Sequence, residues 1–176
     1  GLGDVYKRQH GILSHSIVPA PNSTDLQPVA QDYITRLLNH LNYVGVLTLE
    51  LFVTDQGLFA NEMAPRVHNS GHWSIEGAVC SQFENHIRAV AGLPLGSTDV
   101  IRPTVMVNII GQHPKSEDVL ALNGAHLHLY NKTEREGRKL GHITLMPVNS
   151  EDLVGLCRQL AQILPEPLAL KADMTL

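Results

Sequence analysis

Two glutamates in this sequence have the spacing that a metal site in a hairpin requires. Glu50 and Glu62 each lie in an apolar run of strand length, and Asp55, Gln56 and Gly57 between the runs indicate a turn. A turn centred on Asp55 and Gln56, with a bulge at Gly57, sets Glu50 opposite Glu62 on one face. Opposed like charges destabilise a sheet, and an oxygen-liganded Mg2+ between them removes the repulsion. The alternative is a pair of solvated carboxylates, which a one-residue shift of register would separate.

The loop after the second glutamate carries groups that bind anions. Residues 66–73 read Arg-Val-His-Asn-Ser-Gly-His-Trp. The guanidinium fork of Arg66 suits a carboxylate or phosphate, and His68 and Asn69 add donors that can orient a small oxyanion. Ser74 has the position of an N-cap for a helix that runs to about residue 91, and a helix N-terminus beside a basic loop favours an anion. The alternative is a polar loop whose side chains satisfy their own backbone.

Together these segments resemble the 5-(carboxyamino)imidazole ribonucleotide synthases, which are ATP-grasp ligases of purine biosynthesis. The resemblance runs from about residue 11 to about residue 163, and residues 65–72, Pro-Arg-Val-His-Asn-Ser-Gly-His, are its most specific part. Other ATP-grasp enzymes usually continue from the second metal glutamate as Glu-x-Asn-x-Arg, where the Asn is a further metal ligand. Ala64 stands at that position here. This departure favours the purine carboxylase branch and leaves two protein carboxylates for the metal ions.

The resemblance implies a reaction and a first set of site residues. The reaction converts aminoimidazole ribonucleotide, bicarbonate and ATP to the N-carboxyamino ribonucleotide, ADP and phosphate. Glu50 and Glu62 would hold the Mg2+ ions at the ATP phosphates, and Asn61 and Glu62 would contact ATP. The catalytic residues would be those that cradle bicarbonate and its phosphorylated product, which are Arg66, His68 and Asn69.

A cationic segment near the end of the chain supplies the remaining expected contacts. Residues 132–139 carry four basic side chains around Gly137, a pattern typical of a solvated turn. The resemblance assigns Lys132 and Arg138 to the phosphate of the ribonucleotide substrate. Arg135 and Lys139 are expected to face solvent.

Composition limits the partners and the compartment. The net charge of −4 argues against a nucleic-acid surface, and no apolar run reaches the length of a membrane span. We therefore expect a cytoplasmic protein, and the resemblance implies a homodimer when full length. Cys80 and Cys157 are expected to be buried thiols within helices. None of the ten histidines has a metal-ligand spacing, and His126 and His128 alternate as on one face of a strand.

The elements that must position these residues indicate an α+β fold. We expect residues 10–95 to form the C-terminal part of an ATP-grasp domain and residues 96–176 a small β-rich domain of the sandwich or barrel hybrid type. Residues 1–9 resemble adapter sequence and are excluded from the expected fold. The patterns predict the following elements: strands at 11–20, 104–110, 126–130 and 142–146, helices at 29–41, 74–91, 116–122 and 153–163, and a linker at 92–98.

Two other functions fit parts of the same pattern. One is a different ATP-grasp ligase, biotin-carboxylase-like or glycinamide-ribonucleotide-synthetase-like, against which Ala64 and the run 68–72 count. The other is a dimerisation module without chemistry of its own. The resemblance begins in mid-domain, so we expect a C-terminal fragment that lacks the adenine pocket and the phosphate-clamping lysine of the family.

Overall fold

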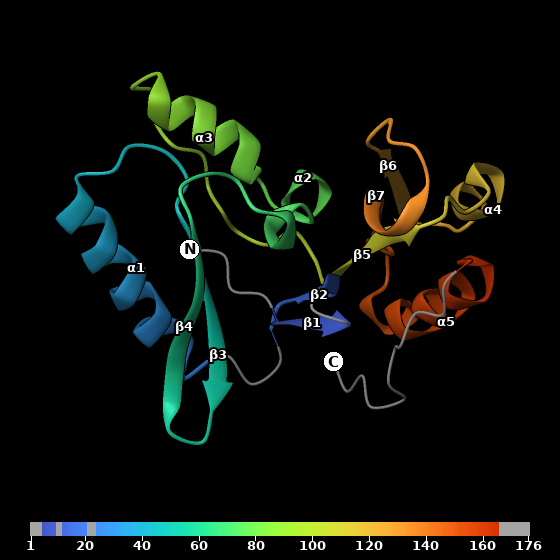
Figure 1. Cartoon of the computed structure of the whole chain (residues 1–176), viewed down its shortest axis with the longest axis horizontal. Helices are drawn as coiled ribbons and strands as arrows, with labels where there is room; N and C mark the ends of the chain where they lie inside the picture. Colours follow the sequence, from blue (N-terminus) through green and yellow to red (C-terminus); the bar gives the residue numbers. More distant parts are fainter. Residues whose placement is uncertain (1–4, 10–11, 21–23, 166–176) are drawn as a thin grey trace.

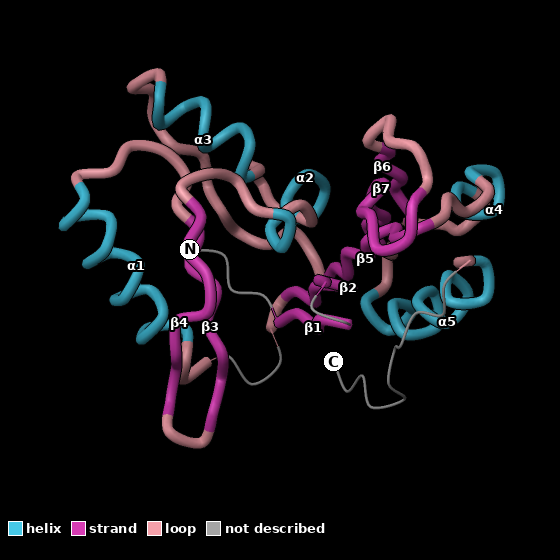
Figure 2. Tube along the Cα trace, in the orientation of Figure 1, coloured by secondary structure: helices cyan, strands magenta, loops and turns pink. Residues whose placement is uncertain are grey.

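A five-stranded antiparallel sheet forms the centre of the molecule (Figure 1). The computed structural model describes residues 5–9, 12–20 and 24–165. The strands of the sheet, in spatial order, are β1 Val5–Gln9, β2 Ile12–Val18, β5 Thr104–Gly111, β7 Arg135–Leu145 and β6 Ala125–Leu129. A separate hairpin of two strands, β3 Thr48–Thr54 and β4 Gly57–Ala64, projects away from this sheet, as Figure 2 shows. The fold is therefore α+β, as the sequence predicts.

The helices gather on two sides of the sheet (Figure 1). One group, with the hairpin, comprises α1 Gln27–Leu41, the 3-10 turn η1 Asn69–Gly71, α2 Ser74–Gly77 and α3 Gln82–Val90. The other comprises α4 Ser116–Leu120, the 3-10 turn η2 Ser150–Asp152 and α5 Leu153–Ile163. Within the described part of the chain, no helix has the length and apolar character needed to cross a membrane.

The two faces of β5 bury different partners because successive side chains of a strand point to opposite faces. Val105, Val107 and Ile109 pack with the apolar stripe of α5 in the larger core cluster. Met106, on the opposite face, packs with Trp73 in the second cluster. The polar loop and α2 therefore cover one face of the sheet, while α4 and α5 cover the other.

The first strand corrects one expectation from the sequence. Residues 5–9 form β1, which pairs antiparallel with β2 from Val5↔Ile17 to Gln9↔Ile12, so their exclusion from the fold is wrong. β2 is buried along most of its length, and its edge gains a hydrogen-bonding partner in β1. The rest of the adapter-like segment, residues 1–4, lies outside the described residues.

Strand pairing also crosses the domain boundary expected at residue 95. β2, which precedes the boundary, pairs with β5, which follows it, from His15↔Val107 to Val18↔Thr104. The division at residues 95 and 96 stays a prediction, but a continuous sheet joins the two sides.

The helix expected over residues 74–91 is interrupted. Ser74 lies within the four-residue α2 rather than at its N-cap, and after Gly77 the chain extends to form a bridge from Ala78 to Val100. A new helix begins after Ser81, whose hydroxyl accepts a hydrogen bond from the Glu84 backbone N–H at 3.2 Å. The sequence Ser-x-x-Glu at 81–84 is a known start signal that periodicity alone overlooks. Four residues also give α2 too little dipole for the expected anion site.

The apolar side of α1 is only partly covered by the described chain. None of its residues is buried, and Val29, Tyr33 and Leu41 are 41%, 37% and 47% exposed. The 3.6-residue spacing of these residues is typical of a helix that packs against a partner.

Candidate functional site

The hairpin brings Glu50 and Glu62 into register. The pairing Glu50↔Glu62 confirms the predicted register, but the bulge lies elsewhere than expected. Asp55 and Gln56 form a tight two-residue turn, and Gly57, at φ 117°, pairs directly with Thr54. The register shifts instead between Glu50 and the next residue, so that Asn61 is the extra residue of β4. A bulge beside a site re-aims side chains, and without this one Glu50 would face Asn61.

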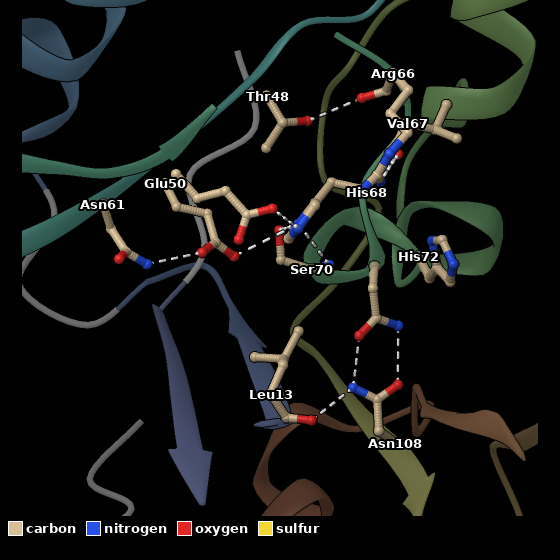
Figure 3. A network of polar contacts seen from close by, with 12 residues as sticks. Leu13, Thr48, Glu50, Asn61, Arg66, Val67, His68, Ser70, His72 and Asn108 are labelled. Atoms are coloured by element: carbon tan, nitrogen blue, oxygen red, sulfur yellow. Dashed lines mark hydrogen bonds and ion pairs between the residues drawn. The ribbon is translucent and has the colours of Figure 1, made fainter. Parts of the chain in front are cut away.

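The carboxylates of the two strands meet a histidine from the polar loop (Figure 3). The His68 imidazole has Nδ1 3.5 Å from Glu50 Oε1 and Nε2 3.9 Å from Glu62 Oε1. Glu50 is 3% exposed, whereas the Glu62 side chain is 44% exposed. Asn61 donates from Nδ2 to Glu50 Oε2 at 3.1 Å, which holds the buried carboxylate in place. The predicted convergence on one sheet face is confirmed.

Burial keeps the imidazole neutral. It lowers the pKa of His68, an effect that outweighs the nearby Glu50 and Glu62 carboxylates, which raise it. Nδ1 accepts a hydrogen bond from the Ser70 backbone N–H at 3.3 Å, so Nε2 carries the proton. The Gln82 side chain fixes the polar loop at His68. It accepts a hydrogen bond from the His68 backbone N–H at 3.0 Å and donates one to the His68 carbonyl at 2.7 Å. The ring that the two glutamates face is therefore neutral.

The two carboxylates fit a divalent cation. One oxygen of each carboxylate and a ring nitrogen of His68 lie within 4.8 Å of one another, but the hydrogen bond at Nδ1 and the proton on Nε2 leave His68 no lone pair for an ion. Two ligands of one Mg2+ ion, each at about 2.1 Å, lie at most about 4 Å apart, so closure by less than about 1 Å completes the arrangement. The carboxylate oxygens of Glu50 and Glu62 are the donors that Mg2+ prefers. Ala64 is buried and adds no ligand.

The carboxylates line a cavity of about 330 Å³ that also contains cations. Its walls are formed by Ile12, Leu13, Glu50, Glu62, Arg66, His68, Asn69, Gly137 and Lys139. Arg66 is exposed and donates from Nη1 to the Val67 carbonyl at 2.9 Å. Two carboxylates and two basic side chains in one cavity can hold a metal ion and an anion next to each other.

Lys139 lies in this cavity, so its expected exposure to solvent is wrong. It is half-buried, and its ammonium donates to Asn69 Oδ1 at 2.8 Å. The pairing of β5 with β7 shifts between Ile109 and Ile110. This irregularity puts Leu140 into the core with α5 and turns Lys139 toward the loop. Simple alternation along β7 does not predict that shift.

Asn69 also has a different setting from the expected one. Its amide exchanges two hydrogen bonds with Asn108, at 2.9 and 2.7 Å, in addition to accepting from Lys139. The side chain lines the cavity, but its oxygen and at least one amide hydrogen are engaged by protein groups. Its role as a direct bicarbonate contact stays a prediction that this geometry does not favour.

The two expected phosphate contacts lie outside the lining of this cavity. The Lys132 ammonium sits 5.3 Å from the centroid of the Tyr130 ring, and Arg138 donates from Nη1 to Thr133 Oγ1 at 3.0 Å. Arg135 is exposed, as expected. The assignments of Lys132 and Arg138 stay predictions.

A cluster of histidines beside the site escaped the sequence analysis. His128 and His142 stack with their centroids 4.3 Å apart, and His72 lies 5.2 Å from His142. His128 Nε2 contacts Glu76 Oε1 at 2.6 Å, and Tyr130 Oη contacts His142 Nδ1 at 2.7 Å. These contacts join α2 to β6 and β7. Only the alternation of His126 and His128 signalled part of the cluster.

This cluster makes stability depend on pH. Burial lowers the pKa of His72 to about 4 and that of His142 to about 3, from the ordinary 6.5. Below pH 6.5 the unfolded chain takes up protons that the folded chain refuses, so stability falls as the pH is lowered toward 4. We expect a loss on the order of 6 kcal/mol in the free energy of unfolding between pH 7 and 4, about 3 kcal/mol from each ring.

Urea unfolding at several pH values, followed by the fluorescence of the single, buried Trp73, measures this loss. His142→Gln should flatten the dependence, because it removes one titrating ring. A variant whose pH dependence parallels that of the unchanged chain would refute the assignment to this cluster.

Comparison with protein families divides the chain in two. Residues 5–83 match the ATP-grasp domain, and residues 104–154 match the phosphoribosylaminoimidazole carboxylase C-terminal domain. The N5-carboxyaminoimidazole ribonucleotide synthase of Pseudomonas aeruginosa is 57% identical over 135 residues, covering 77% of this chain and 37% of the relative. The Escherichia coli enzyme of the same name is 44% identical over 157 residues, covering 89% of this chain and 44% of that enzyme.

Solved structures agree with these matches. The N5-carboxyaminoimidazole ribonucleotide synthetase of Thermus thermophilus superposes with a TM-score of 0.89 at 50% identity, covering 93% of this chain and 46% of that one. The synthase of Aspergillus clavatus, in complex with ADP and 5-aminoimidazole ribonucleotide, gives 0.84 at 30% identity, covering 93% of this chain and 47% of that one. This chain thus spans about two fifths of the length of these curated relatives. The resemblance based on residues 61–73 is confirmed.

Proposed function

Because the chain belongs to the N5-carboxyaminoimidazole ribonucleotide synthase family, we propose that it supplies the metal face and anion cavity of such an enzyme. The reaction carboxylates aminoimidazole ribonucleotide with bicarbonate and ATP. One observation carries the proposal: Glu50 and Glu62 face each other in the same cavity as Arg66 and Lys139. The structure of the A. clavatus relative, in complex with ADP and 5-aminoimidazole ribonucleotide, supports ATP as the nucleotide and aminoimidazole ribonucleotide as the acceptor in this proposal.

The residues of the cavity divide the work of two chemical steps. In the first, a bicarbonate oxygen attacks the γ-phosphorus of ATP, which releases ADP and forms carboxyphosphate. Arg66 and His68 hold the bicarbonate and the developing charge by hydrogen bonds. Asn61 holds the Glu50 carboxylate, and Glu62 faces the nucleotide. Glu50 and Glu62 would hold Mg2+, which would supply charge neutralisation at the ATP phosphates.

In the second step the exocyclic amine of aminoimidazole ribonucleotide attacks the carboxyl carbon. The carbon–nitrogen bond forms, the nitrogen loses a proton, and phosphate departs. Lys132 and Arg138 hold the phosphate of the ribonucleotide, Arg138 as a bidentate fork and Lys132 as a point charge. A closed site is required because carboxyphosphate is a reactive intermediate that water destroys.

Compartment and assembly belong to the same proposal. Cys80 and Cys157 are free and buried, as in proteins of a reducing compartment, which supports the cytoplasm. Cys157 lies in α5, while Cys80 lies between α2 and α3 rather than within a helix. The full-length enzyme would be a homodimer. A pure dimerisation module gives no reason to bury Glu50 opposite a second carboxylate.

A chimeric enzyme tests the proposed function. In it, this chain replaces the matching segment of the P. aeruginosa relative. We expect ATP turnover that requires both bicarbonate and aminoimidazole ribonucleotide. Turnover that requires another acceptor would indicate a different ATP-grasp ligase, and a chimera that folds but hydrolyses no ATP would contradict the proposal.

Loss of the Arg66 side chain should raise the activation free energy of the reaction more than it lowers the stability of the fold. In the chimera, Arg66→Ala is expected to raise the activation free energy by about 2–4 kcal/mol, the usual loss for one oxyanion donor. The melting temperature should change little, because the exposed side chain donates a hydrogen bond only to the carbonyl of the adjacent Val67 within the described chain. Steady-state kinetics and thermal unfolding measure the two effects, with Arg88→Ala on α3 as the control. Equal losses of stability and activity would mark Arg66 as a structural residue.

A further inference from the structure

Asn108 is a buried amide that the reaction described above does not use. It lies on β5, is 5% exposed, and belongs to the face of the sheet that the polar loop covers. Its Nδ2 donates to Asn69 Oδ1 at 2.7 Å and to the Leu13 carbonyl at 2.9 Å, and its Oδ1 accepts from Asn69 Nδ2 at 2.9 Å (Figure 3). Both amide hydrogens and the oxygen of Asn108 thus have partners, which fix its orientation.

The orientation of Asn69 follows from that of Asn108. Asn69 Oδ1 accepts from Asn108 and from the Lys139 ammonium, which is 2.8 Å away. A rotated Asn69 amide would turn its NH2 group toward Lys139, and two donors would then face each other. Asn108 prevents this rotation because it presents a donor to the oxygen and an acceptor to the nitrogen.

We propose that Asn108 is a positioning residue, which acts through the Asn69 amide to hold the Lys139 ammonium in the cavity. Lys139 is then the cation from β7 that binds bicarbonate and carboxyphosphate beside Glu50 and Glu62. An ammonium has three N–H donors, and the bond to Asn69 uses one of them while it aims the group. Asn69 becomes a positioning residue instead of a bicarbonate contact. This inference rests on the proposed function, because it names the anion of that reaction.

A double-mutant cycle in the chimera separates positioning from general stability. The variants are Asn108→Ala, Lys139→Met and both together. Asn85→Ala is the matched control: Asn85 is also buried, and its amide bonds the Gly96 carbonyl at 3.2 Å and the Gly96 N–H at 2.9 Å, away from the cavity lining. We expect each single site variant to lower kcat/KM for bicarbonate on the order of 10-fold or more. The double variant should be no worse than Lys139→Met within about twofold.

The control should lower the melting temperature about as much as Asn108→Ala does but leave kcat/KM for bicarbonate within about twofold of the unmutated chimera. Two outcomes would overturn the inference. One is a double variant whose loss of kcat/KM equals the product of the two single losses, and the other is an Asn108→Ala variant that behaves as the control does.

Calorimetric titration with inorganic phosphate tests the role of Asn108 by binding, without a measurement of turnover. Inorganic phosphate is a probe for the phosphoryl part of carboxyphosphate. The two single site variants should bind phosphate more weakly than the unmutated chimera, and the double variant no more weakly than Lys139→Met. Asn85→Ala should bind it as the unmutated chimera does. Failure of the chimera to carboxylate aminoimidazole ribonucleotide would count against the proposed function, whereas the phosphate titrations decide the role of Asn108. Unchanged phosphate binding in Asn108→Ala would refute that role.

Discussion

The isolated 176-residue chain is expected to show no ATP turnover that depends on bicarbonate and aminoimidazole ribonucleotide. Its described residues hold the paired carboxylates and the anion cavity. The resemblance assigns the adenine pocket and the phosphate lysine to a part of the relatives that this chain does not match. Positioning accounts for about 7–11 kcal/mol of the barrier in well-oriented reactions, and it supplies most of the rate in phosphoryl transfer.

The chimera is the positive control for this prediction, assayed under the same conditions as the isolated chain. The isolated chain should also self-associate, because Val29, Tyr33 and Leu41 leave an apolar stripe exposed on α1. Light scattering measures that association. Substrate-dependent turnover by the isolated chain would contradict the assignment of the ATP contacts. It would also contradict the claim that the site is incomplete without the part of the relatives that this chain does not match.

Replacement of Glu50 by glutamine in the chimera should abolish turnover without loss of stability. Glutamine keeps the shape of the side chain and an oxygen for the bond from Asn61, but it removes the charge that a divalent cation needs. We expect turnover to fall by about 10³-fold or more, equivalent to about 4 kcal/mol in the barrier. The melting temperature without metal should stay equal or rise, because the variant also removes repulsion between Glu50 and Glu62.

Asp55→Asn is the matched control for Glu50→Gln. It removes a carboxylate from the same hairpin, at the exposed turn and outside the cavity lining. Activity should be unchanged in this control. A Glu50→Gln chimera that retains activity, or one that unfolds at a markedly lower temperature, would show that Glu50 serves the fold rather than the metal.

The local signals of the sequence were enough to predict the hairpin and its facing carboxylates. Apolar runs of strand length around a turn define a register, and Glu50↔Glu62 follows from it. The position of the bulge was not predictable in the same way. A bulge at Gly57 and a bulge at Asn61 both bring the glutamates together, and sequence spacing cannot distinguish them.

Features that depend on contacts between residues far apart in the chain could not be predicted from the sequence. Lys139 enters the cavity because β7 shifts its register against β5. Asn108 meets Asn69 because the turn η1, 39 positions away in the chain, packs on the face of the sheet that carries Asn108. The stack of His128 on His142 arises in the same way, from the pairing of β6 with β7. Periodicity predicts which face a residue occupies within its own strand, but not which residues of other elements that face will contact.

The position of the metal ion tests the central claim most directly. Crystals of the chimera grown with ATP and Mn2+, which scatters anomalously, locate the ion without reference to activity. We predict an anomalous peak between Glu50 and Glu62, at roughly 2 Å from a carboxylate oxygen of each. A nucleotide-bound crystal whose Mn2+ peaks all lie away from these two carboxylates would contradict the account.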